Sequence, residues 1–139
     1  MAQSIKEVMT SDPRTVDAAD SVADAAKIMA EADVGAVIVV EDEQVSGIVT
    51  DRDIAVRAVA EGRDPSSTKV SEVATGSPKT LSPDESVEDA EKAMREQDVR
   101  RLPVVEDGRP VGIVSLGDVA EERDAGEALA DISSAPPNN

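Results

Sequence analysis

The chain of 139 residues contains no phenylalanine, tryptophan or tyrosine, although 40% of its residues are apolar. Aliphatic side chains must therefore supply the core, and a purine base could be held only by such side chains and backbone, because aromatic stacking is excluded. Cysteine and histidine are also absent. Their absence excludes disulfides, thiolate or imidazole metal sites, and catalytic triads or dyads that depend on histidine or a thiol.

No apolar run approaches the roughly 18 residues of a membrane-spanning helix, and the first ten residues lack the apolar segment of a secretion signal. We therefore expect a cytoplasmic protein. The net charge is −16, from 14 basic and 30 acidic residues. Because such a field repels nucleic acid phosphates and anionic lipids, neither nucleic acid nor a membrane is expected as a partner. Solubility is the favoured role of this acidity.

The most informative feature of the sequence is an internal repeat. From residue 8 to residue 55, 22 of 48 positions are identical to the residue 65 positions later, without a gap. A duplication explains this match. Because a half of about 60 residues buries little surface alone, we expect the two halves to share one core.

Each half has the pattern of a β-α-β-β-α unit, which predicts an α/β fold with repeats at 4–62 and 69–124. The predicted elements of the first half are a strand at 15–16, a helix capped by Ser21, strands at 36–40 and 45–49, and a helix from Asp51. Their counterparts are a strand at 80–81, a helix capped by Ser86, a hairpin turning at Asp107-Gly108, and a helix from Leu116.

The two ends of the chain carry weaker signals. Ser4 and Glu7 have the spacing of a capping box, which predicts a short opening helix. The segment 62–68 is rich in turn-forming residues and links the repeats. The tail, residues 125–139, ends in serine, proline and asparagine, and we expect it to be partly disordered.

A strand-to-helix junction in each half is the candidate site. Gly47 and Gly112 are followed after three residues by a hydroxyl, Thr50 or Ser115, and after three more by Asp53 or Asp118. Backbone N–H groups and a hydroxyl at a helix start suit a phosphate, and a carboxylate one turn later can accept a hydrogen bond from ribose. The alternative is purely structural, with the hydroxyls as helix N-caps and the acids as first-turn residues. Spacing alone favours this alternative.

The repeated pattern resembles CBS domains, which occur in tandem pairs called Bateman modules. The resemblance rests on Val8-Met9-Thr10, on the Gly-x-x-Thr/Ser-x-x-Asp motif of each half, and on the segment 99–105, Val-Arg-Arg-Leu-Pro-Val-Val. The segments 50–54 and 128–133 are similar to the stand-alone two-CBS proteins of actinobacteria. The resemblance implies two three-stranded sheets packed with pseudo-two-fold symmetry. It also implies two clefts that accept AMP, ADP, ATP, S-adenosylmethionine or NAD.

Carried over position by position, the resemblance implies that Asp53 and Asp118 bind ribose and that Thr50 and Ser115 meet phosphate. The adenine would lie against residues of the opposite repeat. For the Asp118 cleft these residues are Thr10, Thr15, Val16, Val34, Gly35 and Ala36. For the Asp53 cleft they are Thr75, Thr80, Leu81 and Val99.

The second half also carries Arg100 and Arg101, at positions where family members often place basic phosphate ligands. We expect Arg101 to support the Asp118 cleft, which would be the stronger anion site, and Arg100 to face the other cleft. Near the first cleft Asp51 adds negative charge, which Arg52 offsets. Because the chain as a whole is acidic, we expect a monophosphate to be better tolerated than a triphosphate. The alternative is a pair of surface arginines that balance neighbouring acids.

Three function classes compete. The first is a regulatory nucleotide sensor that requires no cofactor and acts on an unknown effector protein in trans, and the second is a ligand-free scaffold. The third, an enzyme, is disfavoured because no catalytic constellation is present. The resemblance further implies a homodimer that associates through helical faces.

Overall fold

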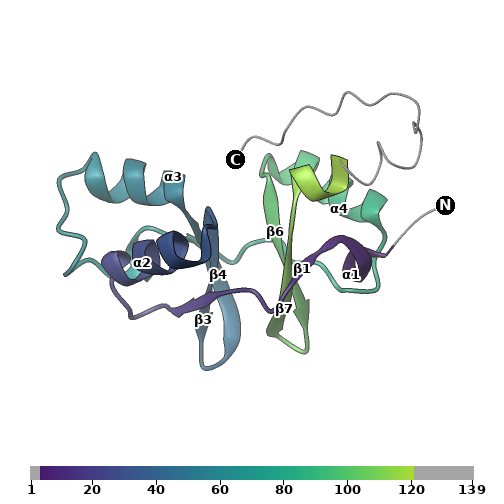
Figure 1. Ribbon diagram of the computed structural model, residues 1–139, viewed down its shortest axis with the longest axis horizontal. Coiled ribbons are helices and arrows are strands. Elements are labelled where there is room, and N and C mark those ends of the chain that lie inside the picture. The colour runs from purple at the N-terminus through teal and green to yellow at the C-terminus, as the bar shows by residue number, and fades with distance from the viewer. Residues whose placement is uncertain (1–3, 121–139) are drawn as a thin grey trace. The chain divides into compact units, whose positions relative to one another are not determined.

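The computed structural model describes residues 4–120, and its chain divides into two compact units (Figure 1). Unit 1 combines the segment up to Asp12 with 79–106 and the part from Val111, and unit 2 combines Pro13–Pro78 with Asp107–Pro110. The end of the predicted second repeat, 121–124, and the tail predicted to be partly disordered, 125–139, lie outside the described residues.

Unit 2 contains most of the first repeat. Its sheet has the order β2-β3-β4-β5, in which β2 runs parallel to β3 and the other pairs are antiparallel. The elements are β2 (Thr15–Asp17), α2 (Val22–Ala32), β3 (Ala36–Glu41), β4 (Gln44–Thr50), α3 (Asp51–Ile54), the π-helix η1 (Ala55–Val59), the 3-10 helix η2 (Val70–Glu72) and β5 (Thr75–Gly76).

Unit 1 contains most of the second repeat, and its three strands have the order β1-β7-β6. The elements are α1 (Ile5–Val8), β1 (Thr10–Ser11), α4 (Val87–Gln97), β6 (Arg101–Glu106) and β7 (Arg109–Ser115), followed by helical residues 116–120. Mixed helix and sheet in both units confirm the predicted α/β class.

The two long helices start and pack as their sequences predict. Ser21 and Ser86 each accept a hydrogen bond from the backbone three residues later, and the aspartate there bonds back to the serine N–H. The apolar stripe of each helix is buried. In unit 2 the stripe of α2 packs with Val37, Val39 and Val49. In unit 1 the stripe of α4 packs with Leu102 and Val114.

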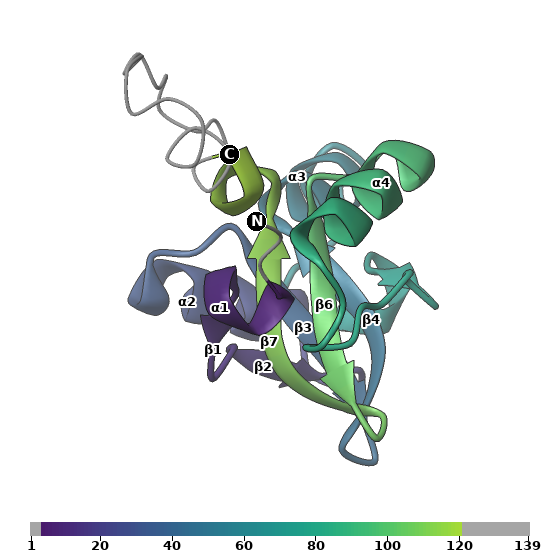
Figure 2. The same cartoon turned by 90° about the vertical axis from the view of Figure 1, so that its right-hand side faces the viewer.

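The opening segment of each repeat pairs with the other repeat. β1 lies beside β7 in unit 1, with Thr10 opposite Ile113 (Figure 2). β5 lies beside β4 in unit 2, with Thr75 opposite Ile48. The buried side chain of Ile5 thus belongs to the core of unit 1.

The expectation of one shared core is wrong, since the described residues form two separate apolar clusters. Val70 and Val73, which open the second repeat, are fully buried in the cluster of unit 2. Each repeat therefore completes the core of the other unit with its opening segment. This exchange supplies the apolar area that a half-chain lacks by itself.

The short opening helix predicted from Ser4 and Glu7 is present as α1, but the Ser4 side chain makes no capping hydrogen bond. Its hydroxyl is buried with no partner among the described residues. Another local prediction is wrong. The strand predicted at 80–81 is reduced to one bridge between Leu81 and Val104, so unit 1 has three strands where unit 2 has four. In unit 2 the N–H of Ile38 donates to Arg14, whereas its counterpart Pro103 has no N–H to donate.

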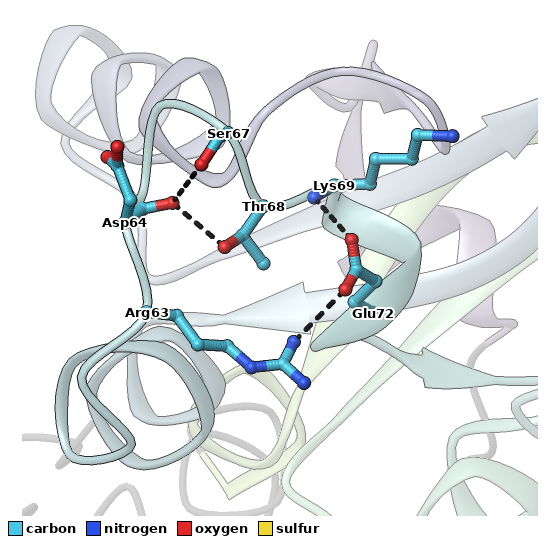
Figure 3. A network of polar contacts seen from close by, with 6 residues as sticks. All are labelled: Arg63, Asp64, Ser67, Thr68, Lys69 and Glu72. Carbon is cyan, nitrogen blue, oxygen red and sulfur yellow. Dashed lines mark hydrogen bonds and ion pairs between the residues drawn. The ribbon is translucent and has the colours of Figure 1, made fainter.

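The link between the repeats is a fixed part of unit 2 (Figure 3). The buried Thr68 hydroxyl donates to the carbonyl of Asp64 at 2.8 Å, and Arg63 pairs with Glu72 at 3.3 Å. Carbonyl groups of the link also accept the first two N–H groups of α2, which have no partner within that helix. The segment therefore acts as a backbone cap for α2.

Candidate functional site

Both predicted junctions form a reciprocal capping box. The Thr50 hydroxyl accepts from the Asp53 N–H at 3.0 Å, and an Asp53 carboxylate oxygen accepts from the Thr50 N–H at 3.0 Å. Ser115 and Asp118 repeat this geometry at 3.1 and 3.0 Å. The interpretation of the hydroxyls as N-caps is thus confirmed.

Capping does not use all the hydrogen-bonding capacity of either junction. In both boxes the second carboxylate oxygen, Oδ1, accepts nothing from residues 4–120, and the hydroxyl hydrogen has no acceptor there. The four side chains are half-buried, so these groups remain accessible. Each junction can therefore offer an acceptor and a donor to a ligand while its helix stays capped.

Close packing of the backbone explains why each motif begins with glycine. A Cβ at Gly47 would lie 2.7 Å from the carbonyl oxygen of Thr75 in β5. At Gly112 it would meet the Met9 side chain and lie 3.0 Å from the carbonyl oxygen of Thr10. Both glycines thus allow the exchanged strand to approach closely.

In unit 2 the start of β3 faces the box. Ala36 is opposite Thr50 in the strand register, and both lie on the sheet face away from the core residues Val37 and Val49. The N–H of Asp51 donates to the carbonyl of Gly35 at 3.0 Å, and an Asp51 carboxylate oxygen accepts from the Arg52 N–H at 2.8 Å. The side chains of Asp51 and Arg52 are both exposed.

In unit 1 Arg101 is the first residue of β6, whereas Arg100 precedes that strand. Leu102 and Val114 face the core, so the alternation of side chains places Arg101 and Ser115 together on the opposite face. The carbonyl of Arg100 accepts from the Leu116 N–H at 2.7 Å. Its side chain lines a hollow of about 320 Å³ beside α4, whose lining residues are Glu91, Met94, Arg95, Asp98, Val99, Arg100 and Leu116.

Sequence reasoning missed this hollow. A signal was available in the repeat, since Glu91 and Arg95 stand where the first half has Ala26 and Ala30. The exchange of small residues for charged ones on one helix face marks a surface that differs between the halves.

The other predicted contact residues have different environments. The side chains of Val16 and Leu81 are 3% and 2% exposed within the cores, so only their backbone groups could reach a ligand. Val34 and Val99 are 40% and 37% exposed. Thr10, Thr15 and Thr75 are exposed and Thr80 is half-buried.

The predicted contact sets divide between the units. Thr10 shares unit 1 with Asp118, whereas Thr15 to Ala36 belong to unit 2. Similarly, Thr75 shares unit 2 with Asp53, whereas Thr80, Leu81 and Val99 belong to unit 1. Contacts between residues of different units stay predictions. Among the described residues no group of three or more acidic side chains is placed to hold a metal ion, and no helix is long and apolar enough to cross a membrane.

Comparison with known proteins gives a clear family assignment. The CBS domain family matches residues 5–59 and 70–125, which together cover most of the chain. The chain belongs to the CBS domain family. The two CBS matches correspond to the two repeats found in the sequence.

Relatives of similar size share the tandem arrangement. The CBS domain-containing protein YhcV of Bacillus subtilis is 42% identical over 134 residues, which cover 94% of this chain and 95% of that protein. Hypoxic response protein 1 of Mycobacterium tuberculosis is 34% identical and covers 83% of this chain and 81% of its own. These matches confirm the likeness to stand-alone two-CBS proteins, including one from an actinobacterium.

A solved structure in complex with ligands shares the fold. The CBS domain pair of protein MJ0100, in complex with 5′-methylthioadenosine and S-adenosylmethionine, superposes with a TM-score of 0.81 at 26% identity. The match covers 91% of this CBS pair and 100% of that chain. A CBS pair of this fold can therefore hold adenosine derivatives.

Proposed function

We propose that this CBS pair is a regulatory, non-catalytic module that binds an adenosine-type nucleotide at the Ser115–Asp118 and Thr50–Asp53 boxes. The observation that carries the proposal is that each box leaves a carboxylate oxygen and a hydroxyl hydrogen unused within the described chain. Ribose hydroxyls and phosphate oxygens are the complementary groups. The ligands of MJ0100 support an adenosine compound as the class.

The ligand screen is a set of melting curves of the full chain with AMP, ADP, ATP, S-adenosylmethionine and NAD, each at about 100 times its Kd. Saturation to that degree adds about 2.7 kcal/mol to the free energy of unfolding. For a domain of this size, the melting temperature then rises by several degrees. A flat response to all five compounds would favour the scaffold function instead.

A matched pair of variants tests the site itself. Asp118→Ala and Asp89→Ala each remove the aspartate of one capping box, but Asp89 lies at the start of α4, outside the proposed site. We expect Asp118→Ala to lose most of the ligand-dependent shift and Asp89→Ala to keep it. Equal retention in both variants would contradict the assignment of Asp118.

We propose further that the module acts as a homodimer on an effector protein in trans. Large apolar side chains are exposed on helical segments of both units: Val56 and Val59 on η1, and Leu116 at the start of the last helix. Val59 is 66% exposed, so Val59→Glu should not disturb the fold. Light scattering should show that this variant shifts from dimer to monomer, and an unchanged mass would exclude η1 from the interface.

A further inference from the structure

In unit 2 the link between the repeats, residues 62–68, covers the start of α2. The N–H of Val22 donates to the carbonyl of Thr68 at 2.9 Å, and the N–H of Ala23 donates to the carbonyl of Pro65 at 3.0 Å. The first N–H groups of a helix have no partner within the helix itself. The link therefore supplies two acceptors that α2 lacks.

In unit 1 the same two groups at the start of α4 have no such cover. They are the N–H groups of Val87 and Glu88, and no group within residues 4–120 accepts a hydrogen bond from them. Val87 is 6% exposed, so water has little access to its N–H. A buried donor without a partner destabilises the folded state. The start of α4 thus lacks the covering segment that the start of α2 has.

An unpaired side chain lies at the same place. An isolated β-bridge sets Ser4 beside Ser86, the N-cap residue of α4. The hydroxyl oxygen of Ser4 is buried, and it has no hydrogen-bond partner among the residues that the structure describes. The large majority of buried polar side-chain atoms in folded proteins have a partner. This hydroxyl does not belong to α4, so it independently indicates that a further segment lies here.

The 65-residue offset of the repeat indicates which segment this is. Ser4 corresponds to Lys69, which forms the equivalent bridge to Ser21 in unit 2. The link corresponds to residues 127–133 of the tail, which lie outside the described residues. Residues 1–3 correspond only to the last three residues of the link, which do not include the acceptor for Ala23. The repeat therefore favours the tail.

The spacing along the chain agrees with this equivalence. In both repeats the second helix begins at a capping box of the same geometry. From Ala55 the chain of unit 2 reaches Thr68 in the same number of residues that separates Ala120 from Ser133. A tail that continues from Ala120 as unit 2 continues from Ala55 brings residues 127–133 to the start of α4.

We infer that residues 127–133 form a strap across the start of α4 of the same chain. Carbonyl groups of this strap accept the N–H groups of Val87 and Glu88, and by the repeat offset Ala130 takes the place of Pro65. The strap completes unit 1 in the way that the link completes unit 2.

The strap is held less firmly than the link. The link leads into Val70 and Val73, which are both fully buried in the core of unit 2. Their counterparts after the strap are Ala135 and Asn138, which have no large apolar side chain. The strap therefore detaches without removing a side chain of this kind from a core, and it is a reversible cover of unit 1.

Amide hydrogen exchange tests the hydrogen bonds of the strap. The wild-type chain is compared with a chain truncated after Gly126. The N–H groups of Val87 and Glu88 should exchange about threefold to tenfold faster in the truncated chain, because each loses one hydrogen bond. Val22 and Ala23 are the matched control, since the link covers them in both chains. Their exchange should not change.

A spin label tests the position of the strap. The chain has no cysteine, so Ser134→Cys gives a single attachment site next to the strap. The label should broaden the amide signals of Val87 and Glu88. A mixture of labelled chains without ¹⁵N and unlabelled chains with ¹⁵N shows whether the broadening crosses between molecules. We expect no broadening in the mixture.

Three results would overturn the inference. Equal exchange of Val87 and Glu88 in both chains would show that the tail does not cover them. Broadening in the mixture would assign the cover to the tail of a second copy. If truncation also accelerates exchange at Ile113 in β7, unit 1 has loosened as a whole and the spin label decides, so that unbroadened signals of Val87 and Glu88 contradict the strap.

Discussion

Gly47 in β4 lies so close to Thr75 in β5 that a methyl group on Gly47 would approach the Thr75 carbonyl oxygen to 2.7 Å. Because that oxygen belongs to the backbone of a paired strand, it cannot move aside without weakening the pairing. The first glycine of the repeated motif therefore serves strand exchange. The hydroxyl and the aspartate of the same motif form the capping box.

This contact predicts that Gly47→Ala destabilises the protein by about 1–3 kcal/mol, the usual cost of forcing extra atoms into a packed site. Urea unfolding measures the change in the free energy of unfolding. Gly76→Ala is the control, since a Cβ there would meet nothing within 4 Å. If the two variants have equal stability, the close approach of β5 does not explain the glycine at position 47.

The hairpin turn of the first repeat is predicted to be strained. Glu43 has a φ of 66°, and its counterpart in the second repeat is Gly108, with a φ of 79°. Left-handed backbone costs a side-chain-bearing residue about 1–2 kcal/mol. Replacing Glu43 by glycine would remove this cost. Two effects would offset part of the gain in stability: glycine loses more entropy on folding, and the exposed ion pair between Glu43 and Arg109 would be lost.

We therefore expect Glu43→Gly to stabilise the protein by about 0.5 kcal/mol. Thermal unfolding measures the gain. Glu43→Ala separates the contributions, because it loses the ion pair but keeps the strained conformation. Stabilisation by alanine equal to that by glycine would show that backbone strain is not the cause.

The exchanged opening segment gives a third prediction. Ile5 is fully buried in the core of unit 1. Ile5→Ala should therefore lower the free energy of unfolding by about 2–5 kcal/mol. Hydrogen exchange should then accelerate at Ile113, which pairs with β1, before it accelerates at Ile48 in unit 2. Lys6→Ala, at an exposed position of the same helix, is the control. Faster exchange at Ile48 first would contradict the assignment of this segment to unit 1.

Acid should weaken one helix cap in a defined direction. Hydrogen bonds from the Ser86 backbone and side chain lower the pKa of Asp89, with a smaller contribution from Lys92. A carboxyl whose pKa is lowered by folding stabilises the folded state above its unfolded pKa, and the stabilisation is lost as the pH falls through the folded pKa. Asp89→Asn should therefore be less stable than wild type at neutral pH, and the difference should shrink in acid.

Urea unfolding at several pH values measures this difference. Asp84→Asn, a change at an exposed acid just before the same helix, controls for the general loss of negative charge. If the difference in free energy of unfolding between wild type and Asp89→Asn stays constant down to acid pH, the proposed role of the cap is contradicted.

Many elements of this protein were determined by the sequence alone, because the interactions that specify them are local. The apolar stripes of α2 and α4 and their serine caps involve residues within one or two turns. The Asp107-Gly108 turn and the capping role of Thr50 and Ser115 depend on neighbours only a few positions away. The duplication itself was visible as a fixed offset.

The tertiary structure decided what depends on partners distant in the chain. Nothing near Thr10 in the sequence indicates that it pairs with Ile113, so the exchange of opening segments and the two separate cores were not predicted. Because Pro103 has no N–H, the second repeat lacks the hydrogen bond that Ile38 makes to Arg14 in the first, and only the bridge between Leu81 and Val104 is left. The alternation of side chains in a formed sheet likewise placed Arg101 on the same face as Ser115, and the fold brought Arg100 to the hollow beside α4.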